Sequence, residues 1–128
     1  MALKAVTLFR EADPFSEDAR GYAAILVRFV DKDHHVLVSI NSKSVPFLSA
    51  KNLSEQERGI LLGAFVAGNV DSQLLRGEKR NDPYAGDIQV IETYRQMLKK
   101  KPKLRILEVE KLIELKSKGQ LKSYLSPS

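Results

Sequence analysis

The residues best suited to binding chemistry are cations near the end of the chain. The run Lys99-Lys100-Lys101-Pro102-Lys103-Leu104-Arg105 places five cations within seven residues. Such a run produces a dense positive potential, and lysine suits phosphate groups or anionic head groups without reading a base sequence. The chemistry it favours is electrostatic binding of a polyanion.

The positive charge is concentrated in the last quarter of the sequence. The chain of 128 residues has a formal net charge of +5, and residues 99–128 hold nine basic and three acidic side chains. We therefore expect the binding surface to continue beyond the run. The candidate residues for nucleic acid or another polyanion are Lys99, Lys100, Lys101, Lys103, Arg105, Lys111, Lys118 and Lys122.

A second set of candidates lies in an earlier stretch without periodicity. Residues 76–86 contain glycine and proline and have no repeating apolar spacing, which is typical of an exposed loop. Its cations and one aromatic ring would suit the same anionic partner; they are Arg76, Lys79, Arg80 and Tyr84. The alternative is a mobile connector with no binding role.

Groups for metal binding or catalysis are sparse. The two histidines, His34 and His35, are adjacent, and neighbouring residues on a strand point to opposite faces, so they do not converge easily on one ion. No phosphate-binding loop, nucleophile elbow or HExxH motif is present. We expect no metal site, no cofactor and no catalytic residue identified by a motif. Paired carboxylates need no motif, so an enzyme stays open as a hypothesis.

The composition is that of a small soluble domain. Hydrophobic residues make up 43% and charged residues 29%, and no apolar run reaches the roughly 20 residues of a membrane span. Early acidic residues exclude a signal peptide, and the absence of cysteine favours the cytoplasm. The length predicts a single domain over residues 1–122 and a flexible tail over residues 123–128.

The elements that position these residues are predicted to begin with a sheet. Residues 4–10 are rich in β-branched and aromatic side chains and predict a strand. Two apolar runs around the polar residues 31–34 predict a central hairpin, in which Phe29 pairs with Val36, Val27 with Val38 and Ile25 with Ile40. Residues 44–48 would add an edge strand, because Pro46 cannot donate to a ladder.

Helices are expected in the second half. Ser54 and Glu57 have the spacing of a capping box, which predicts a helix to about Ala67 with a stop at Gly68-Asn69. A short helix over residues 70–75 would follow.

Further helices are expected on either side of the lysine run. Asp87 is a suitable N-cap for a helix that ends at Lys100, because Pro102 prevents continuation. Residues 104–107 fit either a strand or a helix, and the helix after them should end near Lys118, before Gly119.

The predicted fold class is α+β, with a small antiparallel sheet of three or four strands in the N-terminal half and about three helices in the C-terminal half. The leading hypothesis is a non-enzymatic binding protein with a basic C-terminal surface for nucleic acid or another polyanion, and DNA, RNA and an anionic membrane all fit. The rival is a protein-interaction module, such as an adaptor, an inhibitor or a self-assembling subunit. It would use the edge at residues 44–48 or the helix face with Gly59 and Gly63. A small enzyme with carboxylate chemistry is the third hypothesis.

Overall fold

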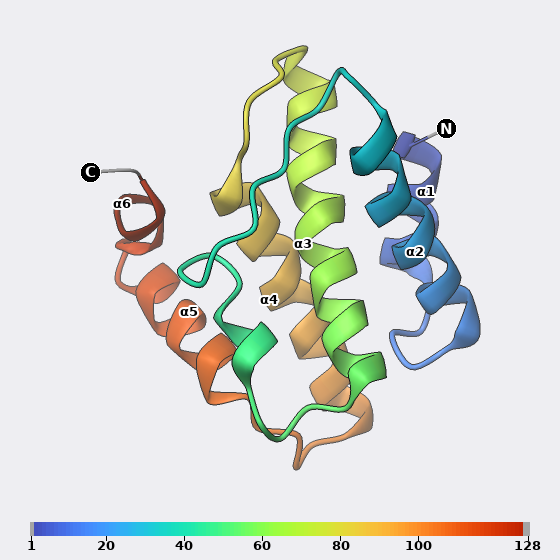
Figure 1. Cartoon of the computed structure of the whole chain (residues 1–128). Helices are drawn as coiled ribbons and strands as arrows, with labels where there is room; N and C mark the ends of the chain where they lie inside the picture. Colours follow the sequence, from blue (N-terminus) through green and yellow to red (C-terminus); the bar gives the residue numbers. More distant parts are fainter. Residues whose placement is uncertain (1, 127–128) are drawn as a thin grey trace.

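The computed structural model describes residues 2–126, and every regular element in that range is helical (Figure 1). The expected α+β fold with an antiparallel sheet is therefore wrong. The elements in chain order are α1 (Ala2–Glu11), α2 (Glu17–Lys32), a short 3-10 helix η1 (Pro46–Ser49), α3 (Glu55–Arg76), α4 (Pro83–Lys100), α5 (Leu107–Ser117) and α6 (Leu121–Leu125).

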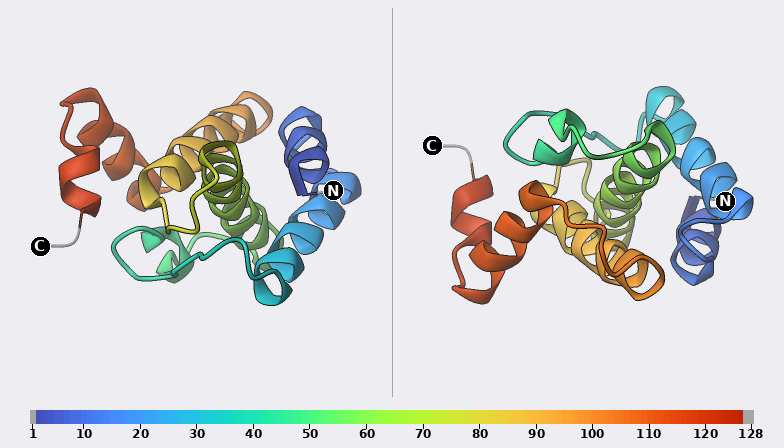
Figure 2. Two further views of the ribbon diagram at one scale, coloured as in Figure 1. Left: turned by 90° about the horizontal axis from the view of Figure 1, so that it is seen from above. Right: turned by 90° about the horizontal axis from the view of Figure 1, so that it is seen from below.

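Helix α3 lies at the centre of the molecule. It packs most extensively on α4 and on its other side against α2 and α1, while α5 and α6 lie beyond α4 (Figures 1 and 2). Phe65 of α3, Tyr94 of α4 and Phe47 of η1 are among the largest fully buried side chains of the protein. A smaller apolar cluster of Ile91, Leu112, Leu121 and Leu125 fastens α5 and α6 to α4.

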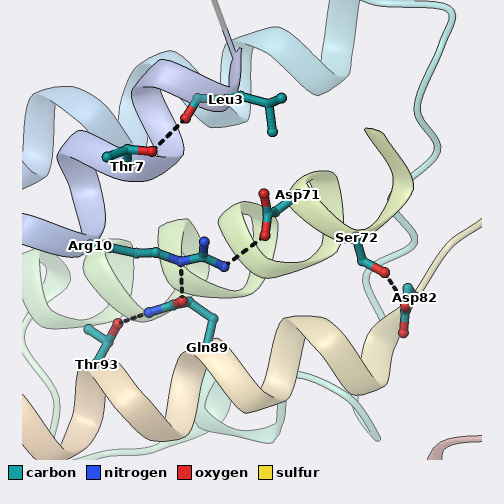
Figure 3. A network of polar contacts seen from close by, with 8 residues as sticks. All are labelled: Leu3, Thr7, Arg10, Asp71, Ser72, Asp82, Gln89 and Thr93. Atoms are coloured by element: carbon teal, nitrogen blue, oxygen red, sulfur yellow. Dashed lines mark hydrogen bonds and ion pairs between the residues drawn. The ribbon is translucent and has the colours of Figure 1, made fainter. Parts of the chain in front are cut away.

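A chain of polar contacts also joins three of the helices (Figure 3). Arg10 of α1 donates to Gln89 of α4 at 2.6 Å and pairs with Asp71 of α3 at 3.2 Å. Gln89 in turn donates to Thr93 at 3.1 Å, so the buried amide of Gln89 has both of its polar ends bonded.

Residues 4–10 belong to helix α1, so the predicted first strand is wrong. The buried side chains of α1 are Ala2, Ala5, Val6 and Phe9, which are spaced three and four apart. That spacing places them on one helical face. The β-branched residues in the run favour a strand locally, but packing of this face against α2 and α3 decides the conformation.

The first arm of the predicted hairpin is helix α2, so the three proposed strand pairs do not exist. Ser16 is the N-cap and accepts a hydrogen bond from the Ala19 backbone N–H at 3.1 Å, and Glu17 and Asp18 follow in the first turn. Carboxylates there stabilise the positive end of the helix dipole. The apolar spacing of the long run fits the repeat of a strand as well as that of a helix. The capping residues that precede the run favour the helix.

The second arm is extended but has no ladder partner. Residues 36–41 run along α3 without secondary structure (Figure 1). The edge strand predicted at residues 44–48 is also wrong, because η1 begins at Pro46. Proline fixes φ near the value that a helical first turn requires, so it starts this turn instead of limiting a sheet.

Helix α3 starts as predicted and ends later. The capping box is confirmed: the Glu57 backbone N–H donates to Ser54 Oγ at 3.1 Å and the Ser54 N–H donates to the Glu57 carboxylate at 3.0 Å. The predicted stop at Gly68-Asn69 and the separate helix over residues 70–75 are wrong, since α3 continues to Arg76. Gly77, with φ of 65°, provides the left-handed C-cap.

We expect Ser54→Ala to lower the free energy of unfolding by about 1 kcal/mol, because the Glu57 N–H loses its acceptor. Ser54→Asp should be close to neutral, since aspartate also caps a helix and favours its dipole. Chemical denaturation of the three proteins measures this. Equal midpoints would contradict a stabilising role for the box.

Helix α4 begins four residues before the predicted N-cap. Asp82 is the N-cap, with its carboxylate accepting from the Ala85 N–H at 3.1 Å, and Pro83 occupies the first turn. Asp87 is instead buried inside the helix, and the loop is shorter than the predicted residues 76–86. The predicted end of α4 at Lys100 is confirmed.

The ambiguous residues 104–106 form a linker before α5, with no strand. The hydroxyl of Tyr94 accepts a hydrogen bond from the Ile106 N–H at 3.1 Å and donates to the Glu110 carboxylate at 2.6 Å. Burial and the Glu110 carboxylate raise the pKa of Tyr94 to about 12. The predicted helix is present as α5, and Gly119 follows it with φ of 69°.

The expected boundary at residue 122 falls within α6. Leu121 and Leu125 are buried, so this part of the predicted tail packs on the molecule. Residues 127–128 lie outside the described range. In the described range, no helix combines the length and apolarity that crossing a membrane requires.

Candidate polyanion-binding site

A cleft of about 790 Å³ lies where four parts of the chain meet. Its walls are the extended segment and the turn after it, the end of α3 with the loop to α4, and α6. The cationic lining residues come from the turn, from the end of α3 with its loop, and from α6; they are Lys43, Arg76, Lys79, Arg80 and Lys122. The two carboxylates in the lining are Glu78 and Asp82.

Three amide side chains hold two walls of the cleft together. Gln73 accepts from the Leu37 N–H at 2.9 Å and donates to the Leu37 carbonyl at 2.7 Å, as a neighbouring strand would. Asn81 accepts from the Ser39 N–H at 3.1 Å, and Asn69 donates to Asn81 at 2.8 Å. Asn69 and Gln73 are buried and bonded to each other. The network therefore replaces a sheet ladder and fixes the extended segment beside the loop.

The carboxylate of Asp82 is occupied by structural contacts. One oxygen caps α4, while the other accepts from the Ser72 hydroxyl at 2.5 Å and lies 3.5 Å from Arg76 (Figure 3 shows the contact with Ser72). The charge of Arg76 is thus partly balanced. The positive potential of the cleft rests mainly on the other four cations.

Two lysines of the cleft lie over aromatic rings. The ammonium group of Lys122 is 5.8 Å from the centre of the Tyr84 ring, and that of Lys43 is 4.8 Å from the Tyr124 ring. Each such contact contributes only about 0.5–1 kcal/mol at an exposed site, so a ligand can displace it. Lys79 and Arg80 are exposed, and among residues 2–126 neither forms an ion pair.

The structure divides the predicted C-terminal cations between separate places. Residues 99–105 lie at the end of α4 and in the linker, while Lys111 and Lys118 belong to α5 and its C-cap. Lys122 alone of the eight lines the cleft. The four secondary candidates, by contrast, come together there: Arg76, Lys79, Arg80 and Tyr84.

Several of the C-terminal cations serve the fold. Lys100 pairs with Asp13 at 2.8 Å and lowers the pKa of that carboxyl. Lys101 pairs with Glu57 at 3.3 Å and lies over the Phe15 ring. Burial alone would raise the pKa of Glu57, but hydrogen bonds from Ser54 and Lys101 outweigh it and lower the pKa. These pairs tie the end of α4 to α3 and to the loop after α1.

The other predicted cations divide into paired and unpaired side chains. Arg105 pairs with Glu110 at 3.8 Å, and Lys118 pairs with Glu114 at 2.8 Å and lowers its pKa. In the described part of the chain, Lys99, Lys103 and Lys111 form no ion pair. These three are exposed and available to solvent.

The site contains residues that the sequence interpretation missed. The sequence interpretation gave no binding role to Lys43, Gln73 or Asn81, and it placed Asn69 at a helix stop. A signal was present: two amides four residues apart fall on one face of a helix that is otherwise apolar there. Buried amides require partners, so this spacing indicates a hydrogen-bonded attachment point.

The two histidines are not among the residues that line the cleft. His34 and His35 are exposed, and His35 contacts Asp33 through Nδ1 at 2.9 Å. Backbone and ring hydrogen bonds from His35 lower the pKa of Asp33 despite some burial. Within residues 2–126, no three histidine or acidic side chains are grouped to hold a metal ion.

Asp87 is the one strongly perturbed carboxyl of α4. It is fully buried, and neither of its oxygens has a hydrogen-bond partner in the described structure. Burial raises its pKa to about 8, which keeps the group protonated and neutral at neutral pH. It is not among the residues that line the cleft.

Comparison with protein-family models, with curated proteins and with solved structures finds no match for this chain.

Proposed function

We propose that this protein is a non-enzymatic binding protein that holds single-stranded nucleic acid in the cleft between the extended segment, the loop after α3 and α6. The observation that supports this is the convergence of five cations from three separate segments on one concave surface. A charged cleft concentrates the field of its side chains and attracts a polyanion more strongly than scattered surface charges do.

The side chains of the cleft suit a phosphate backbone with exposed bases. Lysine contacts phosphate as a point charge, and Arg80 offers a planar group that can bind two phosphate oxygens at once. Tyr84 and Tyr124 lie beside the cationic groups, where a base released from stacking could contact a ring. Bases in a duplex are not free to do this, which favours a single strand.

The rival hypotheses have less support from the geometry. Of the contact surfaces expected for a protein-interaction module, residues 44–48 form no sheet edge, and Gly63 is occupied by packing against Ala23. Gly59 still faces open space. For an enzyme, the two carboxylates of the cleft are the relevant groups, and Asp82 is already engaged by α4, Ser72 and Arg76.

The proposal predicts salt-dependent binding that depends on the cleft cations. A triple variant with Lys79→Gln, Arg80→Gln and Lys122→Gln should bind a labelled single-stranded oligonucleotide more weakly. The slope of log affinity against log salt should become shallower by about 0.7 for each phosphate that the variant no longer neutralises. Fluorescence anisotropy over a range of salt concentrations measures both quantities.

A matched control removes the same charge elsewhere. Lys99→Gln, Lys103→Gln and Lys111→Gln change three exposed cations that lie outside the cleft and form no ion pair in the described range. Binding by this variant should stay close to that of the wild type. If the control loses binding and the cleft variant retains it, the C-terminal run is the interface and the cleft is not. Binding only to anionic vesicles would replace nucleic acid by a membrane surface.

A further inference from the structure

One carboxylate of the cleft has no charged partner. Glu78 lines the cleft and is exposed, and within residues 2–126 it forms no ion pair. The other carboxylate, Asp82, is engaged by structural contacts. A free negative charge repels phosphate, so Glu78 does not favour the backbone of a nucleic acid. A carboxylate is a hydrogen-bond acceptor, and the N–H donors of a nucleic acid are on its bases.

The backbone around Glu78 is fixed by Gln73. After the left-handed residue Gly77, the Glu78 N–H donates to the Gln73 carbonyl at 3.1 Å. Two residues later, the Arg80 N–H donates to the side-chain oxygen of Gln73 at 3.1 Å. Gln73 itself is buried in α3. The two bonds therefore hold the start of the loop on the end of the helix, and a side chain on a fixed backbone meets a ligand at a defined place.

A free donor group lies in the same cleft. Asn81 lines it, and the oxygen of its side chain accepts from the Ser39 N–H at 3.1 Å and from the Asn69 amide at 2.8 Å. Both partners are donors, which assigns this atom as the oxygen of the amide. The amino group of Asn81 is left without a hydrogen-bond partner among residues 2–126. The cleft thus offers two acceptor oxygens from Glu78 and a donor from Asn81.

We propose that Glu78 recognises guanine in the bound strand, a role that rests on the function proposed above. Guanine has two adjacent donors, N1–H and N2–H, on its Watson–Crick edge, with the O6 acceptor beside them. The two oxygens of a carboxylate accept both donors at once, and O6 suits the amino group of Asn81. Adenine and cytosine have one donor group on this edge. Thymine and uracil have one donor between two acceptors, and a carboxylate repels those acceptors.

The tyrosines of the cleft do not supply this preference. Every base has a ring face, so stacking on Tyr84 or Tyr124 tolerates any sequence. A stacked base in a single strand keeps its Watson–Crick edge free for hydrogen bonds, whereas the edges of a duplex are already paired. Selection of a base therefore depends on the polar groups that meet its edge.

The test compares single strands that differ in one group of the base. Three oligonucleotides of equal length contain thymine alone, thymine alternating with guanine, or thymine alternating with hypoxanthine. Hypoxanthine keeps the rings, N1–H and O6 of guanine and lacks only the N2 amino group. The wild type should bind the guanine strand at least about fivefold more tightly than the all-thymine strand, the lower end for a bidentate contact to a base. The hypoxanthine strand should lose most of this preference. Competition followed by fluorescence anisotropy gives the three dissociation constants.

Glu78→Gln replaces the two acceptors by an amide, one end of which donates, and removes the charge that repels phosphate. The guanine preference should disappear, while the affinity for the all-thymine strand stays the same or rises. Damage to the fold would instead weaken the binding of every strand. Glu92→Gln is the matched control, because it removes an exposed carboxylate outside the cleft and should keep the wild-type preference.

Two results would overturn the role of Glu78: equal binding of the guanine and hypoxanthine strands by the wild type, or an unchanged guanine preference in Glu78→Gln. In either case, salt-dependent binding of the all-thymine strand would leave the proposed function standing. If the wild type binds none of the three strands at low salt, both proposals fail together.

Discussion

The contribution of Asp87 to the free energy of unfolding should fall by about 1.4 kcal/mol for each pH unit between about pH 4 and pH 8. Burial raises the pKa of this carboxyl from 3.8 to about 8, since neither oxygen has a hydrogen-bond partner in the described structure. In this range the folded protein keeps a proton that the unfolded chain releases. Unfolding therefore becomes more favourable as the pH rises. Below about pH 4 both states are protonated, and the effect disappears.

Asp87→Asn removes the titrating group and keeps its shape. Chemical denaturation at a series of pH values should show that the difference in slope between this variant and the wild type is confined to the window between about pH 4 and pH 8. Glu92→Gln is the matched control, because it removes an exposed carboxylate from the same helix. If both variants retain the wild-type slope, Asp87 is not held as a neutral group in the folded protein.

Three carboxyls that are bonded to lysines have the opposite effect on stability, and they act at lower pH. The pKa values of Asp13, Glu57 and Glu114 are lowered, and a lysine bonds to each of them. Their contribution is present above the unfolded pKa and is lost as the pH falls through the folded value. These windows lie below that of Asp87, so the two effects separate on the pH axis.

Gly68→Ala should destabilise the protein by at least about 2 kcal/mol, because α3 and α4 approach each other closely at this position. An added methyl group would collide with the Ala85 carbonyl oxygen and lie 2.8 Å from the Gln89 Cβ. The first of these atoms belongs to the α4 backbone, which cannot move without separating the two helices. Denaturation by urea measures the loss.

Gly59→Ala is the control for this prediction, with the same substitution in the same helix. A methyl group at this position would meet no atom within 4 Å. The variant should therefore be more stable by up to about 1 kcal/mol, since alanine favours a helix over glycine. A loss of stability in Gly59→Ala, or none in Gly68→Ala, would contradict the helix packing described above.

The sequence predicts helices well where a cap is visible and poorly where an apolar run allows two periods. Ser54 and Glu57 identified the start of α3, and Pro102 indicated the end of α4. For α2, the same kind of signal was present in Ser16 with Glu17 and Asp18, but β-branched content led to a hairpin. The sequence alone does not show how a segment packs, so nothing corrected the assignment of α2 as a strand. The predicted sheet was built on that strand and was therefore wrong as well.

The end of α3 was predicted wrongly because a glycine can either end a helix or allow close packing within it. The sequence does not show which of these two roles a given glycine has. Gly68 was assigned to a helix stop, yet its role is close contact with α4. Gly77 has the left-handed conformation that ends the helix. The two roles differ only in the surroundings of the residue, which depend on tertiary structure.

The location of the candidate site was only partly predictable from the sequence, and its binding chemistry stays a prediction. The second set of candidates was identified as possible ligands of a polyanion, and all four line one cleft: Arg76, Lys79, Arg80 and Tyr84. The denser lysine run is spread over helix ends, where Lys100 and Lys101 form ion pairs. Charge density along a chain does not indicate which cations already have partners in the fold.

The two hydrogen bonds between Gln73 and Leu37 affect the order in which the protein folds. The most extensive contacts join helices that are neighbours in the chain, and such local topology allows rapid folding. These hydrogen bonds instead join residues 36 positions apart, and the hydrogen bond between Ser39 and Asn81 joins residues 42 positions apart. Closing these loops requires the C-terminal end of α3 and the loop after it to be in place first. We expect the helices to assemble early. The extended segment that forms one wall of the cleft should become ordered last during folding and should unfold first.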